Sequence, residues 1–68
     1  MTAHRGTIVD IYIARQRGIV RGDDGREHPF RRDEMALYMD FRSLKLGDRV
    51  SFEIDANGDP INIERSDR

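Results

Sequence analysis

Short runs of β-branched and aromatic residues alternate with turn-forming residues along the whole chain, a pattern typical of an all-β domain. We expect strands over residues 6–13, 16–22, 26–32 and 49–55, and a last strand that begins at Pro60. Five strands within residues 1–68 leave room for a single domain, with an ordered core over about residues 5–64. Because closing such a sheet removes the edges that promote aggregation, the pattern predicts a small antiparallel barrel.

Turn-forming residues and the alternation of apolar residues predict the turns, the irregular strands and the core of this barrel. Asp23-Asp24-Gly25 and Asn57-Gly58 are typical of tight turns. The glycines of residues 16–22 predict a bend or a bulge, and Pro29, which has no N–H, predicts that the third strand lies at an edge or is distorted. The predicted core consists of Ile8, Ile11, Val20, Phe30, Met35, Leu44, Val50, Phe52, Ile54, Ile61 and Ile63.

Residues 33–47 interrupt the β pattern and predict a short helical turn between the third and fourth strands, with Asp33 as its cap. Leu37, Tyr38 and Met39 within it form either an exposed patch that docks a partner or part of the core. The polar residues 64–68 are expected to fray.

The composition excludes several kinds of site. The chain has no cysteine, which rules out disulfides, thiolate zinc sites and cysteine nucleophiles. We expect His4 in an N-terminal tail and His28 toward the interior or the sheet edge, and no catalytic or metal-ligating spacing is present, so we predict no enzyme, no cofactor and no metal site. The first ten residues lack a long apolar run, so we expect no secretory signal, no membrane span and a cytoplasmic location.

The charges are unevenly distributed along the chain, although the formal net charge is only −1. Residues 1–32 hold seven Arg against four acids, a net charge of +3, and residues 33–68 hold five Lys or Arg against nine acids, a net charge of −4. The chain therefore presents either one basic face or a mixed, solvated surface, and charge alone leaves both interpretations open.

The second half of the chain resembles one known family. Residues 41–54, FRSLKLGDRVSFEI, are similar to the fourth-strand region of bacterial cold-shock proteins, with matches at Phe41, Arg42, Ser43, Leu44, Gly47, Val50, Phe52 and Ile54. The first half matches at Gly6, Ile8, Gly18, Val20 and the turn near Gly25, so that the resemblance covers about residues 5–64. It implies a five-stranded OB-fold barrel, like that of a cold-shock domain, which binds single-stranded nucleic acid.

The sequence departs from this family at the aromatic residues that stack on bases. The family motif Lys-Gly-Phe-Gly-Phe-Ile aligns with residues 15–20, and Val-Phe-Val-His-Phe aligns with residues 28–32, while the first-strand Trp falls at Asp10. The positions expected to face outward have thus lost nearly all their aromatic side chains, whereas those expected to face inward remain small or apolar.

The resemblance and the basic first half together suggest weak, largely electrostatic binding of single-stranded RNA or DNA. The candidate binding residues form an arginine patch with Ile19 beside it and Phe41 and Arg42 at its rim: Arg15, Arg17, Ile19, Arg31, Arg32, Phe41 and Arg42. Two alternatives stay open. The arginines pair with Asp10, Glu27 and Glu34 as a solvated face while Phe41 covers one end of the barrel, or the barrel has lost nucleic-acid binding and docks a protein partner or a second copy through Leu37, Tyr38 and Met39.

Overall fold

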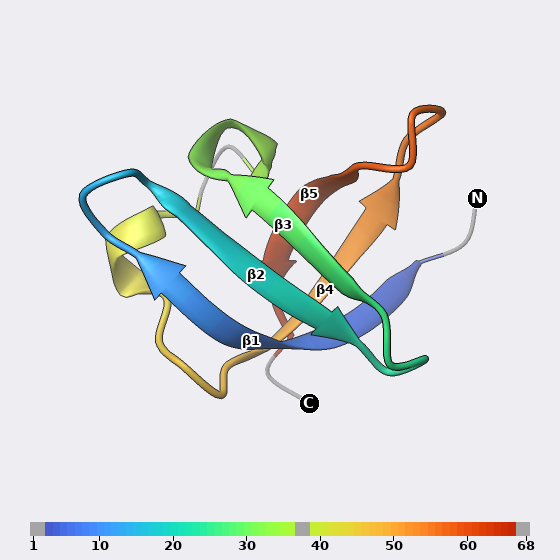
Figure 1. The fold of residues 1–68 in the computed structure, drawn as a ribbon, viewed down its shortest axis with the longest axis horizontal. Coiled ribbons are helices and arrows are strands. Elements are labelled where there is room, and N and C mark those ends of the chain that lie inside the picture. Colours follow the sequence, from blue (N-terminus) through green and yellow to red (C-terminus); the bar gives the residue numbers. More distant parts are fainter. Residues whose placement is uncertain (1–2, 37–38, 67–68) are drawn as a thin grey trace.

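A computed structural model describes residues 3–36 and 39–66, which form a curled, antiparallel five-stranded half-barrel (Figure 1). The elements are β1 (His4–Tyr12), β2 (Arg17–Gly22), β3 (Glu27–Arg31), the 3-10 turns η1 (Arg32–Glu34) and η2 (Phe41–Ser43), β4 (Arg49–Ile54) and β5 (Pro60–Arg65). The strands lie in the order β3-β2-β1-β4-β5. This arrangement confirms the all-β, OB-like fold predicted from the sequence.

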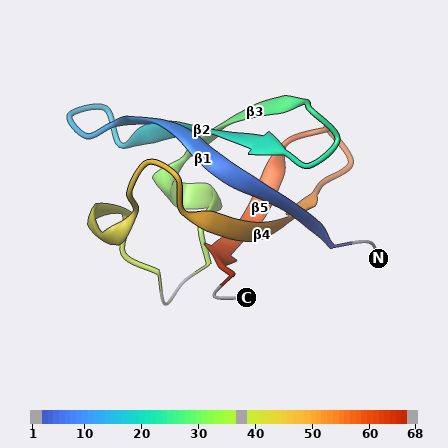
Figure 2. The ribbon, with the colours of Figure 1, turned by 90° about the horizontal axis from the view of Figure 1, so that it is seen from below.

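Strand β1 belongs to both halves of the sheet. Its first residues pair with β4 and its later residues with β2, and Gly6 lies opposite Gly22 on one side and Val50 on the other. A Cβ atom placed on Gly6 would lie 2.5 Å from the backbone oxygen of Arg21, so only glycine fits between these strands. In Figure 2, β2 and β3 lie in one layer, β4 and β5 lie in the layer below, and β1 passes from one to the other.

A bulge in β1 increases the curl of the sheet. The β1–β2 register shifts by one residue at Val9, as expected where a strand bends around a small barrel. The second strand, for which a bend or a bulge was predicted, contains no bulge, because the extra residue belongs to β1 and the β2–β3 register has no shift. Gly18 of β2 instead makes room for Phe30, because a Cβ atom on Gly18 would lie 2.7 Å from Cζ of that ring.

A second bulge lies in β5 at Asn62, which adopts a φ of 53°. It adds one residue to β5 relative to β4 and so interrupts the alternation of side chains. As a result, Pro60 and Ile63 are buried while Ile61 is half-buried and lies outside the core. The prediction that Ile61 belongs to the core was wrong for this reason.

The two predicted hairpin turns are present. Gly25 has a φ of 91° and Gly58 a φ of 85°, conformations that only glycine adopts without strain. In the second turn, Oδ1 of Asp55 accepts hydrogen bonds from the backbone N–H groups of Asn57 and Asp59, each at 2.9 Å. The carboxylate thus holds the turn between β4 and β5.

Strands β3 and β5 approach each other and bring the two ends of the sheet together. Met35 forms a parallel bridge with Ile63, and the N–H of Ala36 donates to the Ile63 carbonyl at 2.9 Å. In the sheet, β3 pairs with no strand other than β2. The edge position expected from Pro29 is therefore confirmed.

The core lies between the two layers. Its buried residues are Ile8, Val20, Phe30, Met35, Phe41, Leu44, Val50, Phe52 and Ile63, and Ile11, Met39 and Ile54 pack against them. Most of the predicted core is confirmed, with Ile11 and Ile54 only partly buried. Phe41 joins it: its ring is 3% exposed and its centroid lies 6.4 Å from that of Phe30.

The connection between β3 and β4 contains two short 3-10 turns instead of one helical turn. Asp33 lies inside η1 and does not cap it, so that prediction was wrong. Asp40 is the residue that caps η2, because its Oδ1 accepts a hydrogen bond from the N–H of Arg42 at 3.0 Å. Leu37 and Tyr38 lie outside the described residues, and Met39 is half-buried against the core.

Both ends of the described chain are held by specific contacts, which corrects two predictions. His4 begins β1 and does not lie in a tail, since its ring stacks on Phe52 with centroids 5.6 Å apart. Arg65 does not fray, because its guanidinium donates to the Ser43 carbonyl at 2.5 Å and to Asp48 at 3.1 Å.

One arginine joins the β2–β3 turn to β4. Arg49 forms two hydrogen bonds of 2.9 Å with the carboxylate of Asp23 and one of 2.8 Å with the hydroxyl of Thr7. The hydrogen bond from Arg49 lowers the pKa of Asp23 below its ordinary value. A lowered pKa in the folded state stabilises the fold above the ordinary Asp pKa, and this contribution is lost as the pH falls through the lowered value.

We expect the Asp23→Asn variant to lose less stability than the wild type on acidification, because it lacks this ionisable partner of Arg49. The measurement is the thermal unfolding midpoint as a function of pH. Asp59→Asn is the matched control, since the side chain of Asp59 has no hydrogen bond or ion pair with any described residue. If the unfolding midpoints of the wild type and Asp23→Asn fell by the same amount on acidification, this role of the pair would be contradicted.

We also expect Gly6→Ala to destabilise the protein by about 2–3 kcal/mol, since the new methyl group overlaps backbone that cannot move without breaking the β1–β2 ladder. Gly47→Ala is the comparison: Gly47 has a φ of 88° but open space around it, so its cost is conformational only, about 1 kcal/mol. Urea unfolding measures both. A smaller cost at Gly6 than at Gly47 would show that the strand crossing tolerates a side chain.

Candidate functional site

The outward side chains of β1, β2 and β3 form two rows across the sheet. One row contains Tyr12, Arg17 and Arg31, because Arg17 lies opposite both of the others. The adjacent row is formed in the same way by Asp10, Ile19 and Pro29. These two rows, which we call the outer face, include three of the predicted binding residues, Arg17, Ile19 and Arg31.

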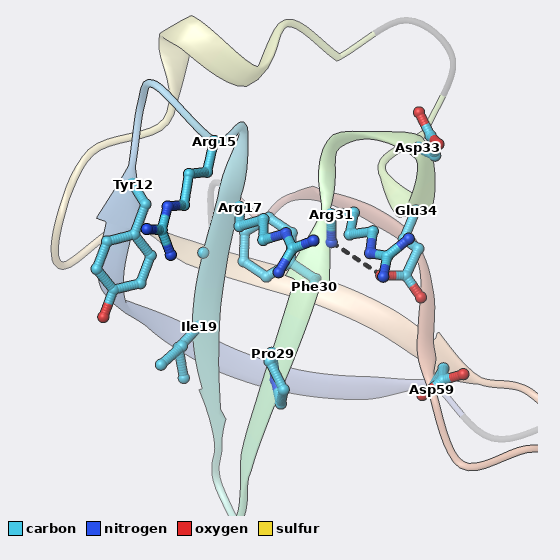
Figure 3. Close-up of a pocket in the computed structure, with 11 residues that line it drawn as sticks. Tyr12, Arg15, Arg17, Ile19, Pro29, Phe30, Arg31, Asp33, Glu34 and Asp59 are labelled. Carbon is cyan, nitrogen blue, oxygen red and sulfur yellow. Dashed lines mark hydrogen bonds between the residues drawn. The ribbon is translucent and has the colours of Figure 1, made fainter.

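The outer face is hollowed, with a volume of about 910 Å³ (Figure 3). Gly18 and Phe30 line the hollow between the rows, and Arg15 extends over it from the β1–β2 turn. The structure thus brings together four of the seven predicted binding residues, namely Arg15, Arg17, Ile19 and Arg31.

Arg17 and Arg31 lie directly opposite each other on neighbouring strands. Like charges in this position destabilise a sheet. Within the described ranges neither guanidinium, nor that of Arg15, forms an ion pair with a carboxylate. The ion pairs found there are Arg21–Glu27, Arg26–Asp24, Arg49–Asp23 and Arg65–Asp48.

The acids that were considered as partners for these arginines bond to other groups. Asp10 accepts from the Tyr12 hydroxyl at 3.1 Å, Glu27 accepts from Arg21 at 2.7 Å, and Glu34 accepts from the backbone N–H of Arg31 at 2.8 Å. The alternative in which the carboxylates of Asp10, Glu27 and Glu34 neutralise Arg15, Arg17 and Arg31 is therefore not what the structure shows.

The hollow has a basic side and an acidic side. Arg15 and Arg17 lie over the β1–β2 end, whereas Asp33, Glu34 and Asp59 lie along the opposite rim (Figure 3). An anion entering the hollow is attracted to the first side and repelled by the second. The arrangement therefore favours an extended anion that follows the β1–β2 side over one that fills the hollow.

The three remaining predicted residues lie elsewhere. Arg32, Phe41 and Arg42 line a smaller hollow of about 230 Å³, together with Ile13 and Gln16 of the β1–β2 turn. The single patch expected from the sequence is thus divided in two by this turn. Phe41 is also excluded as a stacking surface for a base, because its ring is buried in the core.

Tyr12 is the residue of the outer face that the sequence interpretation missed. Its side chain is 46% exposed, and it lines the larger hollow beside Arg15. Alternation along β1 was the available signal: if Asp10 faces outward, so does Tyr12 two residues later. The resemblance to cold-shock proteins pointed to Asp10, where that family has a Trp, and not to this neighbouring aromatic.

The described ranges contain no helix long and apolar enough to cross a membrane. They also contain no group of three or more His, Asp or Glu side chains arranged to hold a metal ion. His28 is half-buried, and its ring centroid lies 5.5 Å from that of Phe52, which agrees with the inward orientation expected for it.

Comparison with known proteins adds no relative: no protein-family model matches the chain, and no curated protein matches it.

The hydrogen bond to Asp10 raises the pKa of the Tyr12 hydroxyl above its ordinary value, since it favours the neutral phenol. The raised pKa stabilises the fold below the ordinary tyrosine value of about 10, and this contribution disappears as the pH rises through the folded-state value. The geometry therefore makes Tyr12 a reporter of its contact with Asp10.

We expect Asp10→Asn to lower the pKa of Tyr12 toward its ordinary value, because the variant removes both the negative charge and the charged acceptor. An ultraviolet absorbance titration of tyrosinate measures this shift. The chain has two tyrosines, so Tyr12→Phe identifies which step belongs to Tyr12. Identical titration curves for the wild type and Asp10→Asn would show that the hydrogen bond does not form in solution.

Proposed function

We propose that this protein binds single-stranded nucleic acid, RNA or single-stranded DNA, on the outer face of β1, β2 and β3. In this proposal it acts in the cytoplasm as a cold-shock-like binding domain without catalysing a reaction. Binding is weak and largely electrostatic, with Arg15, Arg17 and Arg31 contacting phosphates and Ile19 packing against a base or sugar.

The pair formed by Arg17 and Arg31 is the observation that carries the proposal. Arg17 and Arg31 lie opposite each other on β2 and β3, and neither forms an ion pair with a carboxylate among the described residues, so the two like charges cost the folded protein stability. A bound phosphate oxygen between or beside them would convert this repulsion into attraction and accept their hydrogen bonds. A strand of nucleic acid offers such oxygens at regular intervals, which suits an elongated face better than a single small anion does.

The resemblance to cold-shock proteins supports the same face. The alignment places that family's nucleic-acid-binding aromatics at the outward positions of this sheet, including Asp10, Arg17 and Ile19. Exchanging aromatic rings for arginine replaces base stacking by phosphate attraction, although a guanidinium plane also stacks on a base. The acidic rim of Asp33, Glu34 and Asp59 repels phosphate, so we expect the affinity to be low.

We expect Arg17→Ala and Arg31→Ala each to weaken binding of a short single strand and to reduce its salt dependence. Loss of one phosphate contact lowers the slope of log K against log salt by about 0.7 for single strands. Arg21→Ala is the matched control, since Arg21 lies on the same strand β2 but pairs with Glu27 at 2.7 Å. Fluorescence anisotropy of a labelled strand at several salt concentrations provides the affinities.

An amide NMR titration of the wild type locates the site independently. Shifts should cluster on the outer face and fade as salt is added, and they should be small on β4 and β5. If Arg17→Ala and Arg21→Ala lost the same affinity for the strand, the specific role of the Arg17 and Arg31 pair would be contradicted. If no strand binds even at low salt, nucleic-acid binding is wrong, and the alternative becomes a protein-interaction or dimerisation module, tested through Leu37, Tyr38 and Met39.

A further inference from the structure

Tyr12 and Asp10 lie next to each other on the outer face near the end of β1. The Tyr12 hydroxyl donates to Oδ2 of Asp10 at 3.1 Å, so the contact limits the rotation of the ring. Tyr12 pairs with Arg17 and Asp10 pairs with Ile19 across the β1–β2 ladder. Tyr12 therefore lies beside Arg17, which the proposed function assigns to a phosphate.

Among residues 3–36 and 39–66 Tyr12 has the only exposed Phe or Tyr ring, and the rings of His4 and His28 are half-buried beside Phe52. Phe30, Phe41 and Phe52 are all buried, whereas the Tyr12 ring borders the hollow beside Arg15, away from Asp33 (Figure 3). A single-stranded base stacks on such a ring while its phosphate reaches a nearby guanidinium. The position thus combines a stacking surface with basic side chains on the favourable side of the hollow.

Asp10 gives this position a preference among bases. A carboxylate is an acceptor only, and Oδ1 of Asp10 has no hydrogen-bond partner among the described residues. Cytosine, adenine and guanine carry an exocyclic amino group that donates to such an oxygen. Uracil and thymine have no amino group: the one donor on their pairing edge, N3–H, lies between two carbonyl oxygens, which a carboxylate repels.

We propose that Tyr12 and Asp10 form a base subsite in which the base stacks on the Tyr12 ring and its amino group donates to Asp10. The subsite selects strands that contain amino-bearing bases over strands of uracil or thymine. This inference rests on the proposed function, because it needs a strand that is held on the outer face by the arginines. It assigns the selectivity to a residue that by charge alone weakens nucleic-acid binding.

The test compares a short oligodeoxycytidine with an oligodeoxyuridine of equal length. The two strands carry the same phosphates, and their bases have the same ring size and differ only on the pairing edge. We expect the wild type to bind the cytidine strand roughly fivefold more tightly, as one exposed hydrogen bond implies. The ratio of the two affinities does not contain the phosphate contacts, because both strands make the same ones. It should therefore stay nearly constant when salt changes both affinities.

Three variants separate the two roles. Asp10→Asn should bring the ratio close to one, chiefly by raising the affinity for the uridine strand, since it removes the carboxylate that repels the carbonyl oxygens of uracil. Tyr12→Leu should lower the affinity for both strands by about tenfold, because it removes the stacking surface. Tyr12→Phe keeps the ring and should retain most of the affinity. Asp33→Asn is the matched control: it removes the same charge from the far rim of the hollow and should leave the ratio unchanged.

The outcomes distinguish this inference from the proposed function. Equal affinity of the wild type for the two strands, or a cytidine preference that persists in Asp10→Asn, overturns the subsite while leaving the arginine face intact. A ratio that falls equally in Asp33→Asn shows that general electrostatics set the preference, and this also overturns the subsite. Failure of the wild type to bind either strand at low salt overturns both proposals. Thermal unfolding of each variant confirms that these exposed substitutions leave the fold intact.

Discussion

The close approach of strands at Gly6 is the contact on which the rest of the structure depends. At this residue β1 pairs with β2 on one side and β4 on the other, and the 2.5 Å separation between a Cβ atom there and the Arg21 carbonyl leaves space only for hydrogen. Because β1 crosses from one layer to the other here, the bulge at Val9 turns its second half over the core. The β1–β2–β3 surface, and with it the outer face, takes its curvature from this crossing.

The curved sheet separates the residues that stabilise the fold from those that form the candidate site. Alternation sends Val20 and Phe30 inward, where they are at most 1% exposed, while Ile19 and Arg31 beside them face the hollow. An outward aromatic can therefore be exchanged for arginine without removing a core contact. This explains how the outward residues of such a sheet can vary while the inward pattern that forms the core is kept.

The strands and turns could be predicted because their signals are local: β-branched runs, Asp-Gly or Asn-Gly turns, and the missing N–H of Pro29. The two bulges could not, since they depend on how neighbouring strands meet, and the bulge at Asn62 accounts for the error at Ile61. The arginines Arg15, Arg17 and Arg31 could be assigned to one surface from alternation and the alignment. Their lack of carboxylate partners within the described residues was not predictable, because it depends on which side chains the fold brings into reach.

The division of the predicted patch into two hollows limits the path that a strand can take. Arg31 and Arg32 are consecutive, yet they border different hollows on either side of the β1–β2 turn. The backbone N–H of Arg32 donates to the carbonyl of Gln16 at 3.0 Å, which ties β3 to that turn and holds the hollows apart. A strand that contacted both arginines would have to cross the exposed turn, where Ile13 presents an apolar side chain that is 59% exposed. The larger hollow offers a shorter path, from Arg31 past Arg17 to Arg15 and Tyr12, which keeps phosphates near guanidinium groups and ends on the exposed ring.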